Sequence, residues 1–304
     1  MNELTIVILC RNRTEYACQS INSALNQSSS NCRVVVSDNS TSDSIRKLVR
    51  AKFPNVELWI QSGDLTHFEH VARVIDMTES NWITIFHDDD ELLPNYACEV
   101  LSQAAKTPNI GAIAVNSRWI TEDGKLVADR LMVENAPAVL HIQNGKDLIR
   151  RYLGSQPGGI APFNGYAFNR ISLSGLRPSD IEARHYGDAV FIAEIAELSG
   201  IVWIGEPLVN TRIHSGSITS GCDVRDYKLW LRWVAKRFPN NFTRNEIDLY
   251  RIPHLFHELQ KRKRFSIVAM RYLFLRSPVL MLLNTGYRKR ILIKLLKRMG
   301  FLLT

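Results

Sequence analysis

LTIVILC, residues 4–10, is an unbroken run of apolar residues, several of them β-branched. A run of this length without alternation is typical of a strand that is buried on both faces, as in a parallel sheet. TEYACQSINSALNQ, residues 14–27, follows with its apolar residues at helical spacing. A buried strand that leads directly into a helix predicts the first part of a βαβ unit.

Strands and helices are predicted to alternate through the first 90 residues. This alternation predicts an α/β fold with a mostly parallel central sheet flanked by helices. A Gly- and Pro-rich segment at 155–165 is expected to be a loop that borders a substrate. The expected strands are 4–10, 32–40, 56–61, 81–86, 110–120 and one or two within 201–221, and the expected helices are 14–27, 42–53, 67–78, 94–106 and 187–200.

Three polar clusters stand at the ends of predicted strands. CRNR (10–13) follows the first strand, SDNSTSD (37–43) ends the second, and HDDDE (87–91) follows the fourth. Ligands of open α/β sheets bind in the crevice at the carboxyl ends of the strands. The three clusters are therefore expected to form one site.

FHDDDELLP, residues 86–94, contains three consecutive aspartates. Aspartate oxygens are hard ligands for Mg²⁺ or Mn²⁺, and a metal at a nucleotide crevice can bridge a diphosphate to the protein. The alternative is a solvated acidic turn that begins the next helix. The position directly after a buried strand favours the metal. Neither a G-x-G-x-x-G sequence nor a P-loop is present.

These clusters, in this order, resemble the signatures of family 2 glycosyltransferases of the GT-A fold. The resemblance covers about residues 4–220 and implies an inverting enzyme that uses a nucleotide-sugar donor. The segments that carry it are TIVILCRNR (5–13), SALNQ (23–27), VVVSDNSTSD (34–43), FHDDDELLP (86–94), YGDAVFIAEIAELSG (186–200) and TRIHSGSITS (211–220).

The resemblance implies a set of donor-binding residues. Asp38 corresponds to the nucleoside-binding carboxylate, and a carboxylate there can accept hydrogen bonds from a ribose or a base. The alternative for this segment is a turn made by its Asn, Ser and Asp residues. Arg73 stands near the arginine of an Arg-Asn pair of the family, at a different spacing. The expected donor-binding residues are Cys10, Asn12, Arg13, Asp38, Arg73 and Asp88.

The resemblance also implies a metal site. Counted back from Pro94, His87 occupies the position of the family's first aspartate, which places the metal-binding aspartate at Asp89 with Asp90 beside it. A literal Asp-x-Asp reading selects Asp88 and Asp90 instead. His214, in the later Arg-x-His element, is expected to contact the metal or the diphosphate, although an isolated histidine is more often structural. The expected ligands of Mn²⁺ or Mg²⁺ are thus Asp89, Asp90 and His214.

Asp188 falls where the family has its general base. An inverting transfer needs a carboxylate beside the acceptor hydroxyl, on the side opposite the departing nucleotide. The alternative is that Asp188 only caps the helix that it begins. Asp180 and Glu182 are the rival carboxylates in this segment.

The net charge of +8 conceals a strong asymmetry. Residues 1–226 contain 20 Lys+Arg and 27 Asp+Glu, whereas residues 227–304 contain 18 and 3. RKRILIKLLKRMGFLL (288–303) has the pattern of a basic amphipathic helix, which favours binding of residues 261–304 to an anionic membrane surface. Packing on the catalytic domain is the alternative. Nucleic acid is not expected as a partner, because aromatic residues are few here.

The expected organisation is a GT-A catalytic domain at 1–221 and a basic helical C-terminal region at 222–304. The catalytic domain would have a nucleotide-sugar half at about 1–95 and an acceptor half at about 96–221. The expected function is metal-dependent, inverting transfer of a hexosyl group to a hydroxyl of a lipid-linked saccharide, as in assembly of a bacterial O-antigen or capsule. Five cysteines without framework spacing indicate reduced thiols, and the expected location is cytoplasmic, peripheral on the inner face of the cell membrane.

Two other classes of protein remain open from the sequence. A sugar nucleotidyltransferase uses a related sheet and a metal, but such enzymes usually have a Gly-rich loop after the first strand, and CRNRTEY (10–16) has none. A non-catalytic nucleotide-sugar-binding protein would keep the fold without the transfer.

Overall fold

The structure, a computed structural model, describes residues 3–134, 137–156, 158–173, 175–179, 181–214, 224–248 and 250–251. The chain divides into two compact units, Met1–Asn241 and Phe242–Thr304, and the first contains the features below. No helix among the described residues is both long and apolar enough to cross a membrane. The basic segment 261–304 and residues 215–220 of the Arg-x-His segment lie outside the described residues.

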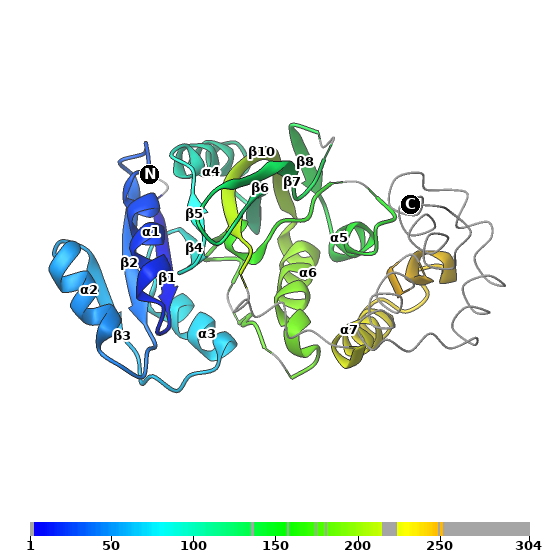
Figure 1. Cartoon of the computed structure of the whole chain (residues 1–304). Coiled ribbons are helices and arrows are strands. Elements are labelled where there is room, and N and C mark those ends of the chain that lie inside the picture. Colours follow the sequence, from blue (N-terminus) through cyan, green and yellow to red (C-terminus); the bar gives the residue numbers. More distant parts are fainter. Residues whose placement is uncertain are drawn as a thin grey trace, which may run out of the picture. The chain divides into compact units, whose positions relative to one another are not determined.

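Ten strands in the described part of the chain form one sheet. They are β1 (Leu4–Cys10), β2 (Cys32–Asp38), β3 (Glu57–Ile60), β4 (Trp82–His87), β5 (Glu91–Leu92), β6 (Ala112–Ile120), β7 (Leu126–Leu131), β8 (Val139–Ile142), β9 (Tyr166–Asn169) and β10 (Ile201–Arg212). The order is β3-β2-β1-β4-β9-β6-β10-β5, with β7 paired to β6 and β8 paired to β10. Figure 1 shows β3, β2 and β1 next to one another at the blue end of the sheet.

The first part of the sheet is parallel, as the alternation predicts. β1 pairs in parallel with β2 and with β4, and β2 pairs in parallel with β3. All seven residues of β1 are buried, which explains why its sequence is apolar without alternation. β9 then enters antiparallel between β4 and β6, so the complete sheet is mixed. The α/β prediction is confirmed.

Helices cover the sheet. They are α1 (Thr14–Leu25), α2 (Ser44–Lys52), α3 (His67–Met77), α4 (Tyr96–Lys106), α5 (Gly145–Tyr152), α6 (Gly187–Ser199) and α7 (Val224–Arg237), with short 3₁₀ helices η1 (Phe163–Gly165) and η2 (Arg184–Tyr186). Apolar side chains of α1, α2 and α4 form one core with alternate residues of β1, including Ile6 and Ile8. α3 contacts β1 and α6 contacts β6 without joining that core, which indicates the opposite face.

The long, strongly patterned elements match their predicted positions within a few residues. The helices predicted at 14–27, 67–78 and 187–200 are α1, α3 and α6. β5, β7, β8, β9 and α5 were not predicted. The first compact unit includes α7, whereas the predicted catalytic domain ends at residue 221, a division that stays a prediction.

Candidate active site

The register of the parallel strands brings the three polar clusters together. Cys10 at the end of β1 lies opposite Asp38 at the end of β2, and Leu9 lies opposite His87 at the end of β4. Asn12 turns the chain here with φ 60°, a left-handed conformation that asparagine tolerates better than most residues. The backbone N–H of Asn12 donates to Ser40 Oγ at 2.8 Å, and this hydrogen bond joins the first cluster to the second.

A cavity of about 630 Å³ opens at this edge of the sheet. Its lining combines the ends of β1 and β4 with residues that lie far away in the sequence. Among the lining residues are Cys10, Arg13, Asn39, His67, His87, Asp88, Asp89, Asp90, Tyr152, Asn164, Asp188, Arg212 and His214. The structure thus brings seven of the predicted site residues together in a single cavity, which His87 also lines. They are Cys10, Arg13, Asp88, Asp89, Asp90, Asp188 and His214.

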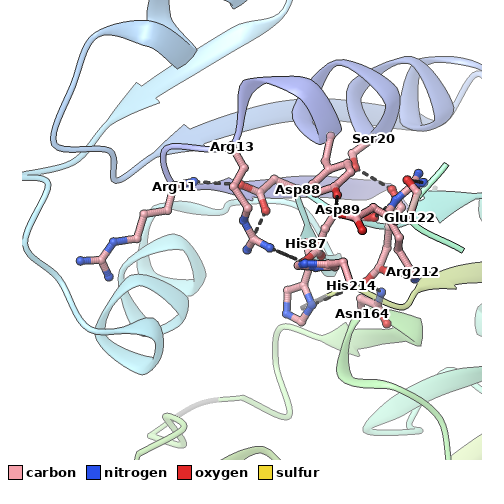
Figure 2. A network of polar contacts seen from close by, with 12 residues as sticks. Arg11, Arg13, Ser20, His87, Asp88, Asp89, Glu122, Asn164, Arg212 and His214 are labelled. Carbon is pink, nitrogen blue, oxygen red and sulfur yellow. Dashed lines mark hydrogen bonds and ion pairs between the residues drawn. The ribbon is translucent and has the colours of Figure 1, made fainter. Parts of the chain in front are cut away.

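Arg13 is the cation that faces the aspartate cluster (Figure 2). Its guanidinium forms an ion pair with Asp88 at 3.0 Å and a second one with Asp89. Asp88 also accepts a hydrogen bond from the Arg11 amide at 3.0 Å. Burial raises the pKa of Asp88 to about 7, although Arg13 and the Arg11 amide favour the carboxylate.

The Asp90 carboxylate accepts two hydrogen bonds from the protein. Its Oδ1 accepts from the Arg212 amide at 2.7 Å, and its Oδ2 accepts from Asn164 Nδ2. Burial raises the pKa of Asp90. Because a carboxylate oxygen has two lone pairs, these hydrogen bonds leave acceptor capacity on Asp90.

His214 reaches the same cluster from the segment after β10. Its Nε2 lies 2.9 Å from Asp89 Oδ2 and 3.4 Å from Arg13 Nη1, and its ring packs at 5.3 Å from the ring of Tyr16. Burial opposes ionisation of Asp89, but His87, Arg13 and His214 together lower the pKa of that carboxyl. Of the three aspartates, Asp89 is the one whose pKa lies below its ordinary value.

The side chains of His87, Asp89 and Asp90 fit a divalent cation. One ligand atom of each lies within 4.8 Å of the others. His87 Nε2 is buried without a hydrogen-bond partner, while Nδ1 lies 3.7 Å from Asp90 Oδ2. Carboxylates suit Mg²⁺ and Mn²⁺, and imidazole is a common ligand of transition metals, so this donor set fits a divalent cation. Asp89, which the sequence singles out, belongs to this set, and His214 adjoins it.

Asp188 lies in the first turn of α6 and lines the same cavity. Its Oδ1 accepts from the Ala189 amide at 2.7 Å, so it does bond to the start of its helix. Burial raises the pKa of Asp188 to about 6. A carboxyl whose pKa is raised toward neutrality, on the wall of a cavity, has the properties of a general base.

The other predicted donor-binding residues are placed differently. Asp38 is 0% exposed, forms an ion pair with Arg46 at 3.0 Å and accepts from the Ser40 amide at 2.9 Å. Asp38 thus bonds to residues of the second cluster and its helix and does not line the cavity, whereas its neighbour Asn39 does. Arg73 is exposed on α3 and does not line the cavity. The binding roles of Asp38 and Arg73 stay predictions.

The sequence pattern assigns no role to His87, Arg212 or His67, all of which line the cavity. His87 was recognised only as a departure from the family pattern, and Arg212 only as part of the Arg-x-His element. His67 begins α3, and its ring lies 5.6 Å from that of His87. Burial lowers the pKa of His67 to about 3, so this ring is neutral. The sequence signal for a role of His87 is its place in HDDDE, where the family pattern has an aspartate.

Arg212 connects α1, the aspartate cluster and the end of β6. Its side chain is 0% exposed, and its donors reach Gln19 Oε1, the Asp89 carbonyl, Glu91 Oε1 and the Thr121 and Glu122 carbonyls. Removal of a buried ion-pair partner leaves the other charge uncompensated.

Arg212→Ala is therefore expected to lower the free energy of unfolding by about 3–5 kcal/mol. The measurement is urea denaturation followed by tryptophan fluorescence. Arg33→Ala is the matched control, because Arg33 and its partner Glu57 are both exposed, and its expected change is below about 1 kcal/mol. Equal losses in both variants would contradict a structural role of Arg212 beyond that of a surface pair.

Residues 5–170 match the sequence model of the family described as Glycosyl transferase family 2. No curated protein matched the sequence. The structure is similar to that of S. aureus TarS 1–349 in complex with UDP-GlcNAc, with a TM-score of 0.58, 13% identity and coverage of 88% of this chain and 77% of that chain. It is also similar to the mannosyltransferase PcManGT from Pyrobaculum calidifontis in complex with GDP-Man and Mn²⁺, with a TM-score of 0.58, 14% identity and coverage of 94% and 82%.

At these identities the similar structures show the fold alone, and that fold is the predicted GT-A type. The family model carries the assignment, since it spans more than half of the 304 residues and includes β1, β2 and the HDDDE cluster. The polar ends of these strands and the family match agree, and the chain belongs to glycosyl transferase family 2.

Proposed function

We propose that this protein is a metal-dependent, inverting glycosyltransferase that moves a hexosyl group from a nucleotide sugar to a hydroxyl of a saccharide acceptor. The observation that carries the proposal is the cavity itself. It joins a His-Asp-Asp ligand cluster at the end of β4 to a carboxyl of raised pKa at the start of α6. Transfer needs both parts, one facing the diphosphate and one facing the acceptor.

Asp188 is proposed to act as the general base. In its ionised form, it accepts the proton of the acceptor hydroxyl while that oxygen forms its bond to the anomeric carbon. The bond between that carbon and the nucleoside diphosphate breaks on the opposite face, so the configuration inverts. The raised pKa helps, because a base works best when its pKa is close to the working pH.

The aspartate cluster is proposed to serve the donor. His87, Asp89 and Asp90 would hold the divalent cation, with His214 beside it. Bound there, the cation would neutralise the negative charge that grows on the departing nucleoside diphosphate. Arg13, already in contact with Asp88 and Asp89, brings a permanent positive charge to the same place.

The donor class is supported by the similar structures. TarS has been solved with UDP-GlcNAc, and PcManGT with GDP-Man and Mn²⁺. We carry over to this chain only the class, a nucleotide sugar with a divalent cation. The sugars and bases named here belong to those two complexes, and the donor of this chain is to be identified by a screen.

That screen is the test of the proposed function. A nucleotide sugar that binds in the presence of Mn²⁺ at about 100 times its Kd should add about 2.7 kcal/mol of stability. The melting temperature is therefore expected to rise by roughly 5 °C or more, and EDTA should abolish the rise. Differential scanning fluorimetry with a panel of nucleotide sugars makes the measurement. The same rise with metal chelated would contradict metal dependence.

We further propose a lipid-linked acceptor at the inner face of the cell membrane, in assembly of a bacterial surface polysaccharide. Residues 261–304 support this, with 12 basic and no acidic side chains. Each Lys or Arg near an anionic surface contributes about 1 kcal/mol to binding. Lys294, Lys297 and Arg298→Gln together are thus expected to weaken vesicle binding about 100-fold.

Sedimentation of the full chain with vesicles of phosphatidylglycerol and phosphatidylcholine measures this binding. Lys47, Arg50 and Lys52→Gln together form the matched control, because these basic residues lie on α2, and they should leave binding unchanged. Equal binding of both variants would overturn the membrane proposal and leave packing on the catalytic domain as the alternative.

A further inference from the structure

The turn that precedes α6 is held by a buried carboxylate from α7. Asp226 is 1% exposed, and its two oxygens face two consecutive residues of η2. Oδ1 lies 3.3 Å from Arg184 Nη1, and Oδ2 lies 2.8 Å from His185 Nδ1. Asp226 is not among the residues that line the cavity. Both of these contacts are with the segment that leads into Asp188.

This turn contains a residue in an unfavourable backbone conformation. Arg184 has φ 49°, in the left-handed region that residues with a side chain seldom adopt. Such a conformation is unfavourable and persists where the surroundings impose it. The ion pair with Asp226 connects Arg184 itself to α7, so the strained residue is also the one that the carboxylate contacts.

Two packing contacts fix the same turn. The ring of Tyr186 stacks on Trp230 of α7, with centroids 5.4 Å apart and planes at 23°. Gly187 is packed so closely that an added Cβ would lie 2.7 Å from Phe68 Cζ of α3 and 2.3 Å from the Ser179 carbonyl oxygen. Arg184, His185 and Tyr186 thus contact α7, and Gly187 packs against Phe68 of α3, immediately before Asp188.

Burial of Asp226 needs an explanation other than net stability. A carboxylate loses several kcal/mol of hydration when it is buried, and ion pairing repays this only with good geometry. An apolar residue of similar size often stabilises a protein at least as well. An apolar residue can neither pair with the Arg184 guanidinium nor bond to His185 Nδ1, and these contacts act on the turn that leads into the proposed base.

We propose that Asp226 is a positioning residue for Asp188: it fixes the Arg184–Gly187 turn and so aims the base at the acceptor hydroxyl. The proposal rests on the proposed role of Asp188. α7 is then a part of the catalytic apparatus, although it belongs to the region that the sequence assigns to a separate basic extension.

The test compares Asp226→Asn with the wild type in transfer kinetics. A misplacement of about 1 Å costs roughly 100-fold in rate, so kcat is expected to fall 10- to 100-fold. The KM for the donor and the donor-induced rise in melting temperature should stay within about twofold of the wild type, because the aspartate cluster is untouched. His185→Gln keeps the carboxylate and a side-chain N–H donor in a different geometry, so it should show a smaller fall in kcat.

Glu194→Gln is the matched control. Glu194 of α6 pairs with Arg237 of α7 at 2.8 Å, so this variant removes another link between the same two helices. It leaves the turn alone, and kcat should not change. If Asp226→Asn keeps the wild-type kcat, or if kcat, KM and melting temperature all fail together in both Asp226→Asn and His185→Gln, the positioning role is overturned.

A second readout does not depend on activity. Limited trypsin digestion with mass spectrometry reports cleavage after Arg184, whose side chain is half-exposed. Release of the turn in Asp226→Asn should accelerate this cleavage about tenfold relative to the wild type and to Glu194→Gln. An unchanged rate would overturn the proposal, even in a wild type that shows no transfer. Absence of transfer in the wild type, with the accelerated cleavage present, would instead contradict the proposed function alone.

Discussion

Asp188→Asn is expected to lower kcat for sugar transfer by about 1000-fold, since general-base catalysis contributes 10²–10⁴-fold. The amide cannot take the proton of the acceptor hydroxyl, yet it is nearly the same size and can still accept from the Ala189 amide. The fold and the donor site should therefore be unchanged. The measurement is transfer kinetics together with the donor-induced rise in melting temperature.

Glu182→Gln is the matched control for this variant. Glu182 is an exposed rival carboxylate in the same segment, and its substitution should change kcat by less than about twofold. Asp180, the other rival, lies outside the described residues, and Asp180→Asn tests it directly. Loss of transfer in either rival variant, with transfer retained in Asp188→Asn, would contradict the assignment.

The pH profile offers a check on the same group. Burial raises the pKa of Asp188 to about 6, so the free enzyme carries the active carboxylate above this pH and the inactive acid below it. kcat/KM should accordingly fall as the pH drops through about 6. The residual activity of Asp188→Asn should lack this dependence. The same acidic limb in both proteins would assign it to another group.

Asp89→Asn is expected to weaken Mn²⁺ binding by at least about 100-fold, because even the loss of an outer-shell partner of a metal site typically costs 10- to 100-fold. The pKa of Asp89 is lowered, and one of its oxygens lies within 4.8 Å of ligand atoms of His87 and Asp90. Electron paramagnetic resonance of free Mn²⁺ measures the affinity without any need for catalysis.

Asp88→Asn separates the two readings of the aspartate cluster. The asparagine can still accept from the Arg11 amide, as Asp88 does, and it leaves His87, Asp89 and Asp90 in place. Mn²⁺ affinity should therefore stay within about fivefold of the wild type. Loss of Mn²⁺ binding in Asp88→Asn, with binding kept in Asp89→Asn, would favour the literal Asp-x-Asp reading.

The parts of the fold that the sequence predicts are those with strong local patterns. β1 and β4 are short apolar runs bounded by polar clusters, and α3 begins with a capping box of Thr66 and Glu69. Each of these signals is complete within one segment. β9, only four residues long, forms because β4 and β6 offer it partners, and its own sequence carries no such signal.

The site shows the same division. The proximity of Arg13 and the aspartates follows from parallel strands whose ends coincide, and this much was predictable. The orientation of each side chain was not. Asp38, buried against Arg46, and Arg73, exposed on α3, are in positions that spacing alone does not reveal. The contact of Asp226 with Arg184 and His185 joins segments that have no common sequence pattern.

Release of nucleoside diphosphate from nucleotide sugars by the wild-type protein tests directly whether this chain is a metal-dependent glycosyltransferase. UDP-GlcNAc and GDP-Man begin the panel, with Mn²⁺ present or chelated and Asp188→Asn as the inactive control. We expect nucleoside diphosphate to be released from at least one donor, and this release should require both the metal and Asp188. A donor that binds and stabilises the protein but is never cleaved, at any metal concentration, would contradict the claim and favour a non-catalytic nucleotide-sugar-binding protein.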